Sequence, residues 1–298
     1  MSKVHILGSI NFDLVIHADC MPSQGETVRG HGFLSNSGGK GANQATAVAK
    51  LGGDARLIGA IGKDFFGEQS LNLLKEVGVD CLGVEQVDVN TGTAVIFISN
   101  GDNRIIIDHG ANFAIEPNRV KQILKQNVQQ GDVFVTQMEV PVDCIEQSLQ
   151  LAKQQGAITV LNPAPAKDVT DTMLKYCDVV IPNESEAELI CGLPAEGLEN
   201  LKAIERYFQS KGVKNVIVTL GAKGCYFNGA IYPIPRKVNV VDTTAAGDTF
   251  VGALCTRLAQ GKTIEESLTF CQTASAITIT RNGAQIAIPW LEEIEKSA

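Results

Sequence analysis

Asp242-Thr243-Thr244-Ala245-Ala246-Gly247-Asp248-Thr249-Phe250 is the stretch that decides the fold and the chemistry of this chain. It joins an apolar run, Val238–Val241, to a helix-like segment that continues to Leu258. Two alanines and a glycine allow a sharp turn and leave main-chain amides uncovered where the helix starts. Unpaired N–H donors and the positive end of the helix dipole suit such a start to binding an anion.

Asp248 lies at the mouth of this predicted anion site. A carboxylate repels an anion unless it has another task, and accepting a proton from a substrate hydroxyl is the obvious one. An aspartate that merely caps the helix fits the same residues and is common. From this stretch alone, both interpretations remain open.

A second glycine-rich turn, SGGKGANQA at Ser37–Ala45, also leads into a helix-like segment. Together, the two turns resemble the paired signatures of the ribokinase-like (PfkB) family of carbohydrate kinases. Further motifs follow in the family's order: GSINFD from Gly8, NPAP from Asn162, NESE from Asn183 and TLGAKG from Thr219. The resemblance covers essentially the whole chain, so residues 1–298 are expected to form one kinase domain.

The composition is that of an ordinary soluble globular protein, with 298 residues, 44% hydrophobic and 19% charged. A net charge of −8 without a Lys/Arg cluster argues against nucleic acid as a partner. The sequence shows no membrane-span pattern and no signal peptide, and its eight scattered cysteines form no C-x-x-C pair. We therefore expect free thiols and a cytoplasmic location. The four histidines share no zinc-ligand spacing.

Short apolar runs alternate with helix-period segments, which predicts a doubly wound α/β fold with a mostly parallel sheet. Core strands are expected at Val4–Ser9, Arg56–Ile61, Asp132–Thr136, Ile158–Leu161, Val179–Ile181 and Asn215–Thr219. Helices are expected at Ala42–Leu51, Gly67–Glu76, Val142–Gln155, Ser185–Ile190, Leu198–Lys211, Asp248–Ala259 and Thr263–Thr280.

Two segments, Thr27–Asn36 and Gly92–Asp108, alternate with period two and have no helix between their strands. The second contains a hairpin pattern whose turn, residues 100–103, is rich in Asn and Gly. They predict a small β lid formed from about residues 10–36 and 90–108, the alternative being an extension of the main sheet. An exposed apolar face on such a sheet needs a partner, so we expect a homodimer formed through the lid.

Phosphoryl transfer to an alcohol needs a proton acceptor, donors for the transferring phosphate, Mg²⁺ and exclusion of water. Asp248 is the expected general base, and the amides of Ala245, Ala246 and Gly247 are the expected anion hole. The chain contains no G-x-x-x-x-G-K-[ST] phosphate loop, so the expected anion site is of a different kind. It also has no G-x-G-x-x-G after its first strand, which argues against a nucleotide-binding dehydrogenase.

The resemblance implies further site residues. The sugar would be bound by Asn11, Asp13, Gly39, Lys40, Asn43 and Glu139 together with Asp248. ATP would lie against Asn183, Thr219, Gly221, Gly224, Gly247 and Gln272. Glu186 would act on Mg²⁺, partly through water, although the N-x-x-E spacing also fits a helix capping box. A K⁺ ion would be held, mostly by main-chain oxygens, at Asp242, Thr244, Thr278, Arg281, Gly283 and Ala287.

Ala287 departs from the family pattern, because many members carry a serine there, and K⁺ prefers oxygen ligands. The resemblance implies ATP-dependent phosphorylation of D-ribose at the 5-hydroxyl. Another acceptor, such as deoxyribose, a fructose-type sugar or adenosine, is the alternative. A non-catalytic sugar-binding protein on the same fold is disfavoured by the intact Asp248 and anion-hole residues.

Overall fold

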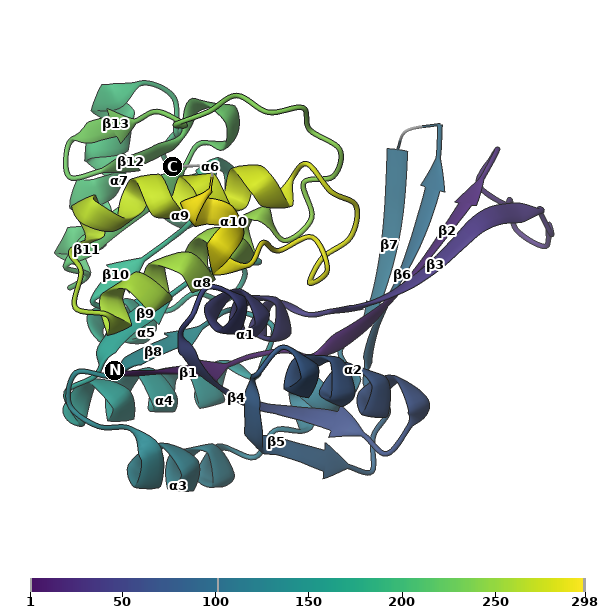
Figure 1. Ribbon diagram of the computed structural model, residues 1–298, viewed down its shortest axis with the longest axis horizontal. Coiled ribbons are helices and arrows are strands. Elements are labelled where there is room, and N and C mark those ends of the chain that lie inside the picture. Colours follow the sequence, from purple (N-terminus) through teal and green to yellow (C-terminus); the bar gives the residue numbers. More distant parts are fainter. Residues whose placement is uncertain (1, 101, 297–298) are drawn as a thin grey trace.

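The computed structural model describes residues 2–100 and 102–296, and a nine-stranded sheet runs through this part of the chain (Figure 1). In spatial order its strands are β13 (Ala230–Tyr232), β12 (Cys225–Phe227), β11 (Asn215–Thr219), β10 (Val179–Val180), β9 (Ile158–Leu161), β8 (Val133–Thr136), β1 (Lys3–Leu7), β4 (Asp54–Gly62) and β5 (Asp80–Val87). The strands from β11 to β5 are parallel, and only β12 and β13 run antiparallel to their neighbours.

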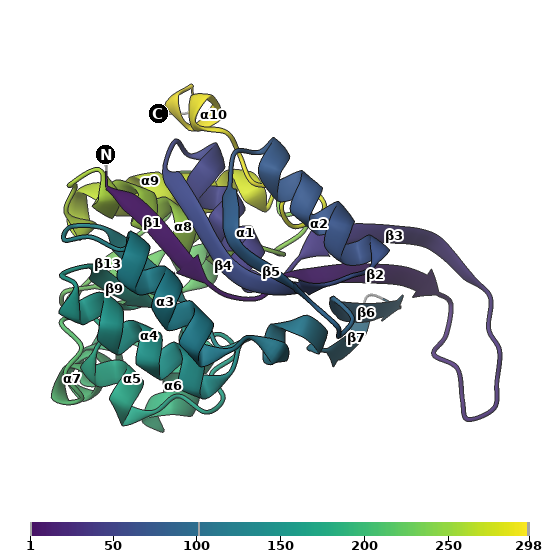
Figure 2. The ribbon, with the colours of Figure 1, turned by 90° about the horizontal axis from the view of Figure 1, so that it is seen from below.

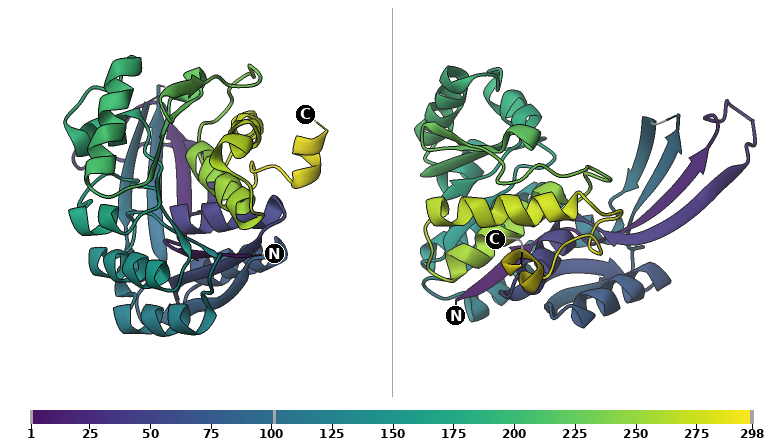
Figure 3. Two further views of the ribbon diagram at one scale, coloured as in Figure 1. Left: turned by 90° about the vertical axis from the view of Figure 1, so that its left-hand side faces the viewer. Right: turned by 45° about the horizontal axis from the view of Figure 1, so that its top comes forward.

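Helices cover both faces of this sheet (Figure 3). One face carries α1 (Lys40–Lys50), α2 (Phe65–Glu76), α8 (Ala246–Ala259), α9 (Ile264–Thr278) and α10 (Leu291–Glu295). The other carries α3 (Pro117–Asn127), α4 (Val142–Gln154), α5 (Asp171–Lys175), α6 (Glu184–Cys191) and α7 (Leu198–Ser210). Two short 3-10 turns, η1 (Gly110–Ala114) and η2 (Gly221–Lys223), complete the described elements. The predicted doubly wound fold is confirmed.

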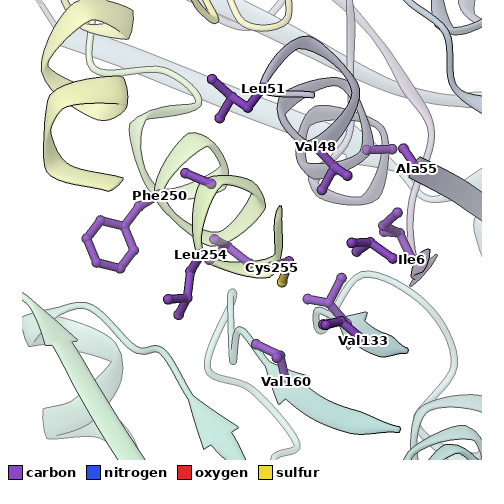
Figure 4. Packing of buried hydrophobic residues seen from close by; sticks show 14 of the residues in the cluster. Ile6, Val48, Leu51, Ala55, Val133, Val160, Phe250, Leu254 and Cys255 are labelled. Atoms are coloured by element: carbon purple, nitrogen blue, oxygen red, sulfur yellow. The ribbon is translucent and has the colours of Figure 1, made fainter. Parts of the chain in front are cut away.

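Successive side chains of the central strands supply the two cores. Ile6 packs on the α1 and α8 face, and its neighbour Leu7 packs on the opposite face. Figure 4 shows Val48 of α1 and Leu254 of α8 meeting strand side chains such as Val133. Each fully buried aliphatic side chain of this kind contributes about 1.5–3 kcal/mol of burial free energy. The strands therefore read as continuous apolar runs rather than alternating ones.

The predicted β lid is a separate four-stranded sheet that projects from one edge of the molecule (Figures 1 and 2). Its strands are β3 (Gly30–Gly38), β2 (Asn11–Ala18), β6 (Gly92–Ser99) and β7 (Asp102–Asp108), in that order. The lid is therefore not an extension of the main sheet. β6 and β7 pair as the predicted hairpin, with Ser99 opposite Asp102; Gly101 of its turn lies outside the described residues.

All six predicted core strands and all seven predicted helices are present, with ends shifted by at most a few residues. The prediction omitted α3, whose polar sequence buries only Val120 and Leu124, and β5, which lies at the edge of the sheet. It also omitted four short elements: α5, α10, β12 and β13. It also placed the start of α8 at Asp248, whereas this helix begins at Ala246. None of the helices in the described chain is long and apolar enough to cross a membrane.

Candidate active site

The candidate site lies at the carboxyl ends of the central strands. Gly8 follows β1, Gln137 follows β8, Asn162 follows β9 and Asn183 lies just past β10. The chain connects β1 to β4 on one side, whereas β8 pairs with the other side of β1. Ligands of open α/β sheets bind at such a switch in strand order, outside the carboxyl ends of the strands.

Glycines bring the start of α1 against the end of β1. A Cβ added to Gly8 would lie 2.6 Å from Gly41 Cα, and one added to Gly41 would lie 2.5 Å from the Gly8 carbonyl carbon. Gly39, the N-cap of α1, has a φ of 88°, which only glycine adopts without strain. The glycines of the GSINFD and SGGKGANQA motifs therefore allow a close backbone crossing that puts Lys40 and Asn43 beside the strand ends.

The starts of α1 and α8 carry the central contact of the site. A Cβ on Gly252 of α8 would lie 2.5 Å from Ala47 Cβ of α1, so the two helices pack closely. Asn43 Nδ2 donates to Asp248 Oδ2 at 2.9 Å, and Gln44 Nε2 donates to Asp248 Oδ1 at 3.1 Å. Both oxygens of the carboxylate thus accept a hydrogen bond from α1.

Asp248 is not a helix cap. The N-cap of α8 is Ala245, and no side chain caps this helix. Asp248 is 7% exposed, and burial raises the pKa of its carboxyl above the usual value. The Lys40 ammonium and the two amide hydrogen bonds act in the opposite direction and favour the charged form. The carboxylate is therefore a buried group held by α1 and not the cap of α8.

Of the predicted sugar residues, Asn43 bonds Asp248, and Lys40 and Glu139 act on its charge. Ser9 Oγ donates to Glu139 Oε2 at 2.5 Å, and the Lys40 amide donates to the same oxygen at 3.2 Å. Burial and the nearby Glu139 raise the pKa of Asp13 to about 6, and Lys40 opposes this. Burial lowers the pKa of Lys40, but four surrounding carboxylates outweigh it, so the net shift is upward.

Asn11, another predicted sugar residue, is hydrogen-bonded by Asn112, which the sequence analysis did not single out. Its Oδ1 accepts from Asn112 Nδ2 at 2.7 Å, and Asn112 Oδ1 accepts from the Ile10 amide at 2.8 Å. Gly92 leaves room for this hydrogen bond, because a Cβ at that position would lie 2.3 Å from both Asn11 Oδ1 and Asn112 Nδ2. The Asn112 side chain therefore orients Asn11 at the base of the lid.

A cavity of about 710 Å³ lies against the first turn of α8, at Ala246 and Gly247. Every residue predicted to contact the nucleotide lines it: Asn183, Thr219, Gly221, Gly224, Gly247 and Gln272. Its remaining wall is largely apolar and includes Val240 and Ile279. A smaller cavity of about 210 Å³ adjoins the first and is lined by Lys40, Glu186, Ala245 and Asp248. The two spaces meet at the Ala246 and Gly247 main chain.

The turn at the start of α8 has the features of an anion site. Ala245 has a left-handed φ of 60°, an uncommon conformation for alanine. The Ala246 amide makes a long hydrogen bond of 3.3 Å to the Thr243 carbonyl, and no side chain caps the first turn of the helix. A Cβ added to Gly247 would meet no atom within 4 Å, so space lies directly in front of the turn. Strain of this kind is typical of functional sites.

The N-x-x-E motif forms a capping box. Asn183 Oδ1 accepts from the Glu186 amide, and Glu186 Oε2 accepts from the Asn183 amide, both at 2.8 Å. Glu186 nevertheless lines the smaller cavity with Lys40 and Asp248. Burial raises the pKa of its carboxyl. No group of three or more His, Cys, Asp or Glu side chains in the described residues could hold a metal, so Mg²⁺ here would need ligands from the nucleotide and water.

The predicted cation residues converge from two segments. Asp242 Oδ1 accepts from the Thr244 amide at 2.9 Å and hydroxyl at 2.6 Å, and its Oδ2 accepts from the Gly283 amide at 3.0 Å. Thr278 is fully buried, and its hydroxyl lies 3.0 Å from that of Thr249. The remaining two predicted residues lie in the segment after α9: the Arg281 side chain pairs with Glu293, and Ala287 is buried.

Three buried amides near Asp248 were not predicted as site residues: Gln44, Gln137 and Asn162. Gln44 and Asn162 belong to motifs that the sequence analysis quoted, so a signal was present for them. Gln137 follows a fully buried strand, which gives no cue to its role. These three side chains form one hydrogen-bonded chain.

A nucleotide-sized cavity that meets a buried carboxylate at an anion-binding helix start defines a kinase acting on a small hydroxylated acceptor. The pfkB family carbohydrate kinase model matches residues 1–291. The ribokinase of Schizosaccharomyces pombe is 40% identical over 313 residues, covering 100% of this chain and 98% of that protein. A deoxyribokinase of Salmonella typhi is 31% identical, covering 98% and 97%. The structure of Arabidopsis thaliana ribokinase complexed with ribose and ATP superposes with a TM-score of 0.91 at 30% identity, covering 99% and 98%. The chain belongs to the pfkB family of carbohydrate kinases.

Proposed function

We propose that this protein transfers the γ-phosphoryl group of ATP to the 5-hydroxyl of D-ribose, giving D-ribose 5-phosphate and ADP. The single observation that carries the proposal is Asp248, which is buried, lines the smaller cavity and is hydrogen-bonded by Asn43 and Gln44. The full-length similarity to ribokinases supports ribose and ATP as the substrates.

In this mechanism Asp248 accepts the proton of the attacking hydroxyl. The two amide donors hold its carboxylate plane, so a lone pair of each oxygen stays directed elsewhere. The amides at Ala245, Ala246 and Gly247 stabilise the charge that develops on the transferring phosphoryl group. Lys40 is surrounded by carboxylates and stays protonated, so it can neutralise phosphate charge in the same space.

Ribose would be held by Asn11, Asp13, Gly39, Lys40, Asn43 and Glu139. Asn43 Oδ1 is buried without a hydrogen-bond partner, which supports a role as acceptor for a sugar hydroxyl. Asp13 and Glu139 each offer two oxygens to neighbouring hydroxyls. The lid strands carry Asn11 and Asp13, so lid position would control access to the sugar and exclude water.

Two metal ions belong to the proposal. Mg²⁺, bound mainly by ATP and water with Glu186 nearby, would neutralise phosphate charge. K⁺ would be held at Asp242, Thr244, Thr278, Arg281, Gly283 and Ala287, largely by main-chain oxygens, which are the ligands that hard cations prefer. The Gly283 amide already bonds Asp242 in the turn before α8. An ion there would stiffen the anion hole.

The lid supports a homodimer. Phe33 and Leu34 of β3 and Ile105, Ile106 and Ile107 of β7 are each 48–66% exposed. Consecutive strand residues face opposite sides of the sheet, so both faces of the lid carry exposed apolar side chains, and a second copy of the lid would cover one of them. Light-scattering mass measurements on the wild type and on Ile106→Glu test it, with a shift toward monomer expected in the variant. All eight cysteines are free thiols, which supports a reducing compartment such as the cytoplasm.

A coupled ADP-release assay with ribose, 2-deoxyribose, fructose and adenosine tests the substrate. The highest kcat/KM should be with ribose, because an acceptor that lacks a bound hydroxyl leaves buried polar groups unpaired. A higher kcat/KM with 2-deoxyribose or adenosine would assign the chain to that substrate instead. Turnover with none of the four would refute the proposal.

A further inference from the structure

A chain of buried carboxamides runs beneath the candidate site and ends on Asp248. Gln137 Nε2 donates to Gln44 Oε1 at 2.6 Å, and Gln44 Nε2 donates both to Asn162 Oδ1 at 3.0 Å and to Asp248 Oδ1 at 3.1 Å. Asn162 Nδ2 in turn donates to the Ile181 carbonyl at 2.9 Å. Gln44 and Gln137 are 0% exposed, and Asn162 is 7% exposed.

The direction of this chain is set by the Ile181 carbonyl, which can only accept. Asn162 must therefore turn its NH₂ group toward Ile181 and its oxygen toward Gln44. That oxygen requires a donor, so the Gln44 NH₂ group faces Asn162 and Asp248, and the Gln44 oxygen faces the NH₂ group of Gln137. A main-chain atom of the sheet thus ensures that Gln44 presents a donor to the carboxylate.

At the end of the carboxamide chain that is far from Asp248, the Gln137 side chain is confined. Gln137 Oε1 is buried without a hydrogen-bond partner. A Cβ added to Gly8 would lie 2.1 Å from that oxygen, so only glycine leaves room for the Gln137 amide. The carboxamides therefore cannot easily reverse their donor and acceptor directions. If Gln44 exchanged the positions of its oxygen and its NH₂ group, buried atoms would lose their hydrogen-bond partners.

We infer that Gln44 is the positioning residue of the general base: its amide holds Asp248 Oδ1 in place and keeps the carboxyl ionised. The inference rests on the proposed role of Asp248. A neutral amide does this at every working pH, because it does not titrate. Asn43 binds the other oxygen, but its own Oδ1 has no partner and it is also a proposed sugar ligand, whereas both ends of the Gln44 amide are bonded to protein side chains.

Gln44→Glu provides the sharpest test. Its side chain keeps the acceptor for Gln137 but places a second carboxyl about where Nε2 lies, 3.1 Å from Asp248 Oδ1. Two carboxyls at this separation share a proton, so the pair titrates at a higher pH. We expect the acid limb of the kcat–pH profile to move upward by at least about one unit. Gln44→Met, which lacks the donor but adds no charge, should lower kcat roughly 10- to 100-fold with the ribose KM within about threefold.

Thr46→Val is the matched control. Thr46 lies on the same helix, is 1% exposed and has no hydrogen-bond partner for its hydroxyl. This variant should leave kcat and the pH profile unchanged. Gln137→Met leaves both contacts of Asp248 intact, so it should leave the acid limb close to that of the wild type.

An acid limb of Gln44→Glu that coincides with that of the wild type would overturn the inference. A Gln44→Met enzyme with wild-type kcat and a lower melting temperature would do the same, because Gln44 would then be only structural. If Gln44→Glu does not fold, an acid limb of Gln44→Met that coincides with that of the wild type overturns it, because loss of the Gln44 donor should raise the pKa of Asp248. Asp248→Asn tests the proposed function separately: if this variant retains wild-type kcat on ribose, the assignment of Asp248 as the base fails.

Discussion

Replacing Asp248 by Asn tests the base with almost no change in shape. The wild-type carboxylate accepts from Asn43 Nδ2 on one oxygen and from Gln44 Nε2 on the other. An asparagine has one oxygen, so one of these two donors must face an NH₂ group, at a cost of about 1–3 kcal/mol. Removal of a charge that burial disfavours acts in the opposite direction. We therefore expect a folded protein whose melting temperature changes by only a few degrees.

Turnover should respond much more strongly than stability. The amide cannot accept a proton at neutral pH, so kcat should fall by roughly 10²–10⁴. The ADP-release assay at saturating ribose and ATP measures this, and calorimetry with ribose checks that sugar binding is largely kept. The wild-type kcat should decline as the pH falls through a value above the usual aspartate pKa, because burial raises the pKa of Asp248. A variant whose kcat stays within about threefold of wild type would refute the assignment of the base.

Three further outcomes follow from the same contacts. Burial and Glu139 raise the pKa of Asp13 to about 6, so kcat/KM for ribose should fall as the pH drops through about 6. The fall should be less steep in Asp13→Asn; pH profiles of equal slope in the variant and the wild type would contradict this. Lys50→Met removes a buried ammonium that donates to the carbonyls of Gln285 and Ile288 at 2.8 and 3.0 Å. The free energy of unfolding from thermal melts should fall by about 1–3 kcal/mol per unpaired carbonyl; an unchanged melting temperature would disprove this. Ala287→Ser should lower the KCl concentration for half-activation at constant ionic strength; identical titrations would place residue 287 away from the ion.

The sequence was sufficient to predict the core strands and helices because their signals are local. β9 and β11 occupy the predicted residues, since each is a short apolar run between turn-forming segments. α3 was omitted because its buried face is only two residues wide, too little for a periodic signal. β5 was omitted because an edge strand has a mixed exposure pattern.

The contacts of the candidate site are different, since they join residues far apart in the chain. Asn43 and Asp248 are separated by 205 positions, and nothing local in either segment indicates that they touch. The resemblance of the two turns to a known family led only to the expectation that both residues bind the sugar. The amide chain was not expected at all, because each of its members alone resembles an ordinary buried polar residue.

The glycines of the motifs explain why these distant contacts form. A side chain at Gly8 would strike Gln137 and Gly41, and a side chain at Gly252 would strike Ala47 Cβ and the Gln44 carbonyl. Each of these glycines therefore sets the distance between two elements that carry a member of the amide chain or the base itself. Motif residues without functional groups thus help to determine the geometry of the candidate site. Substituting Gly252 by alanine would push α8 away from α1, so it should harm the base through its position rather than its chemistry.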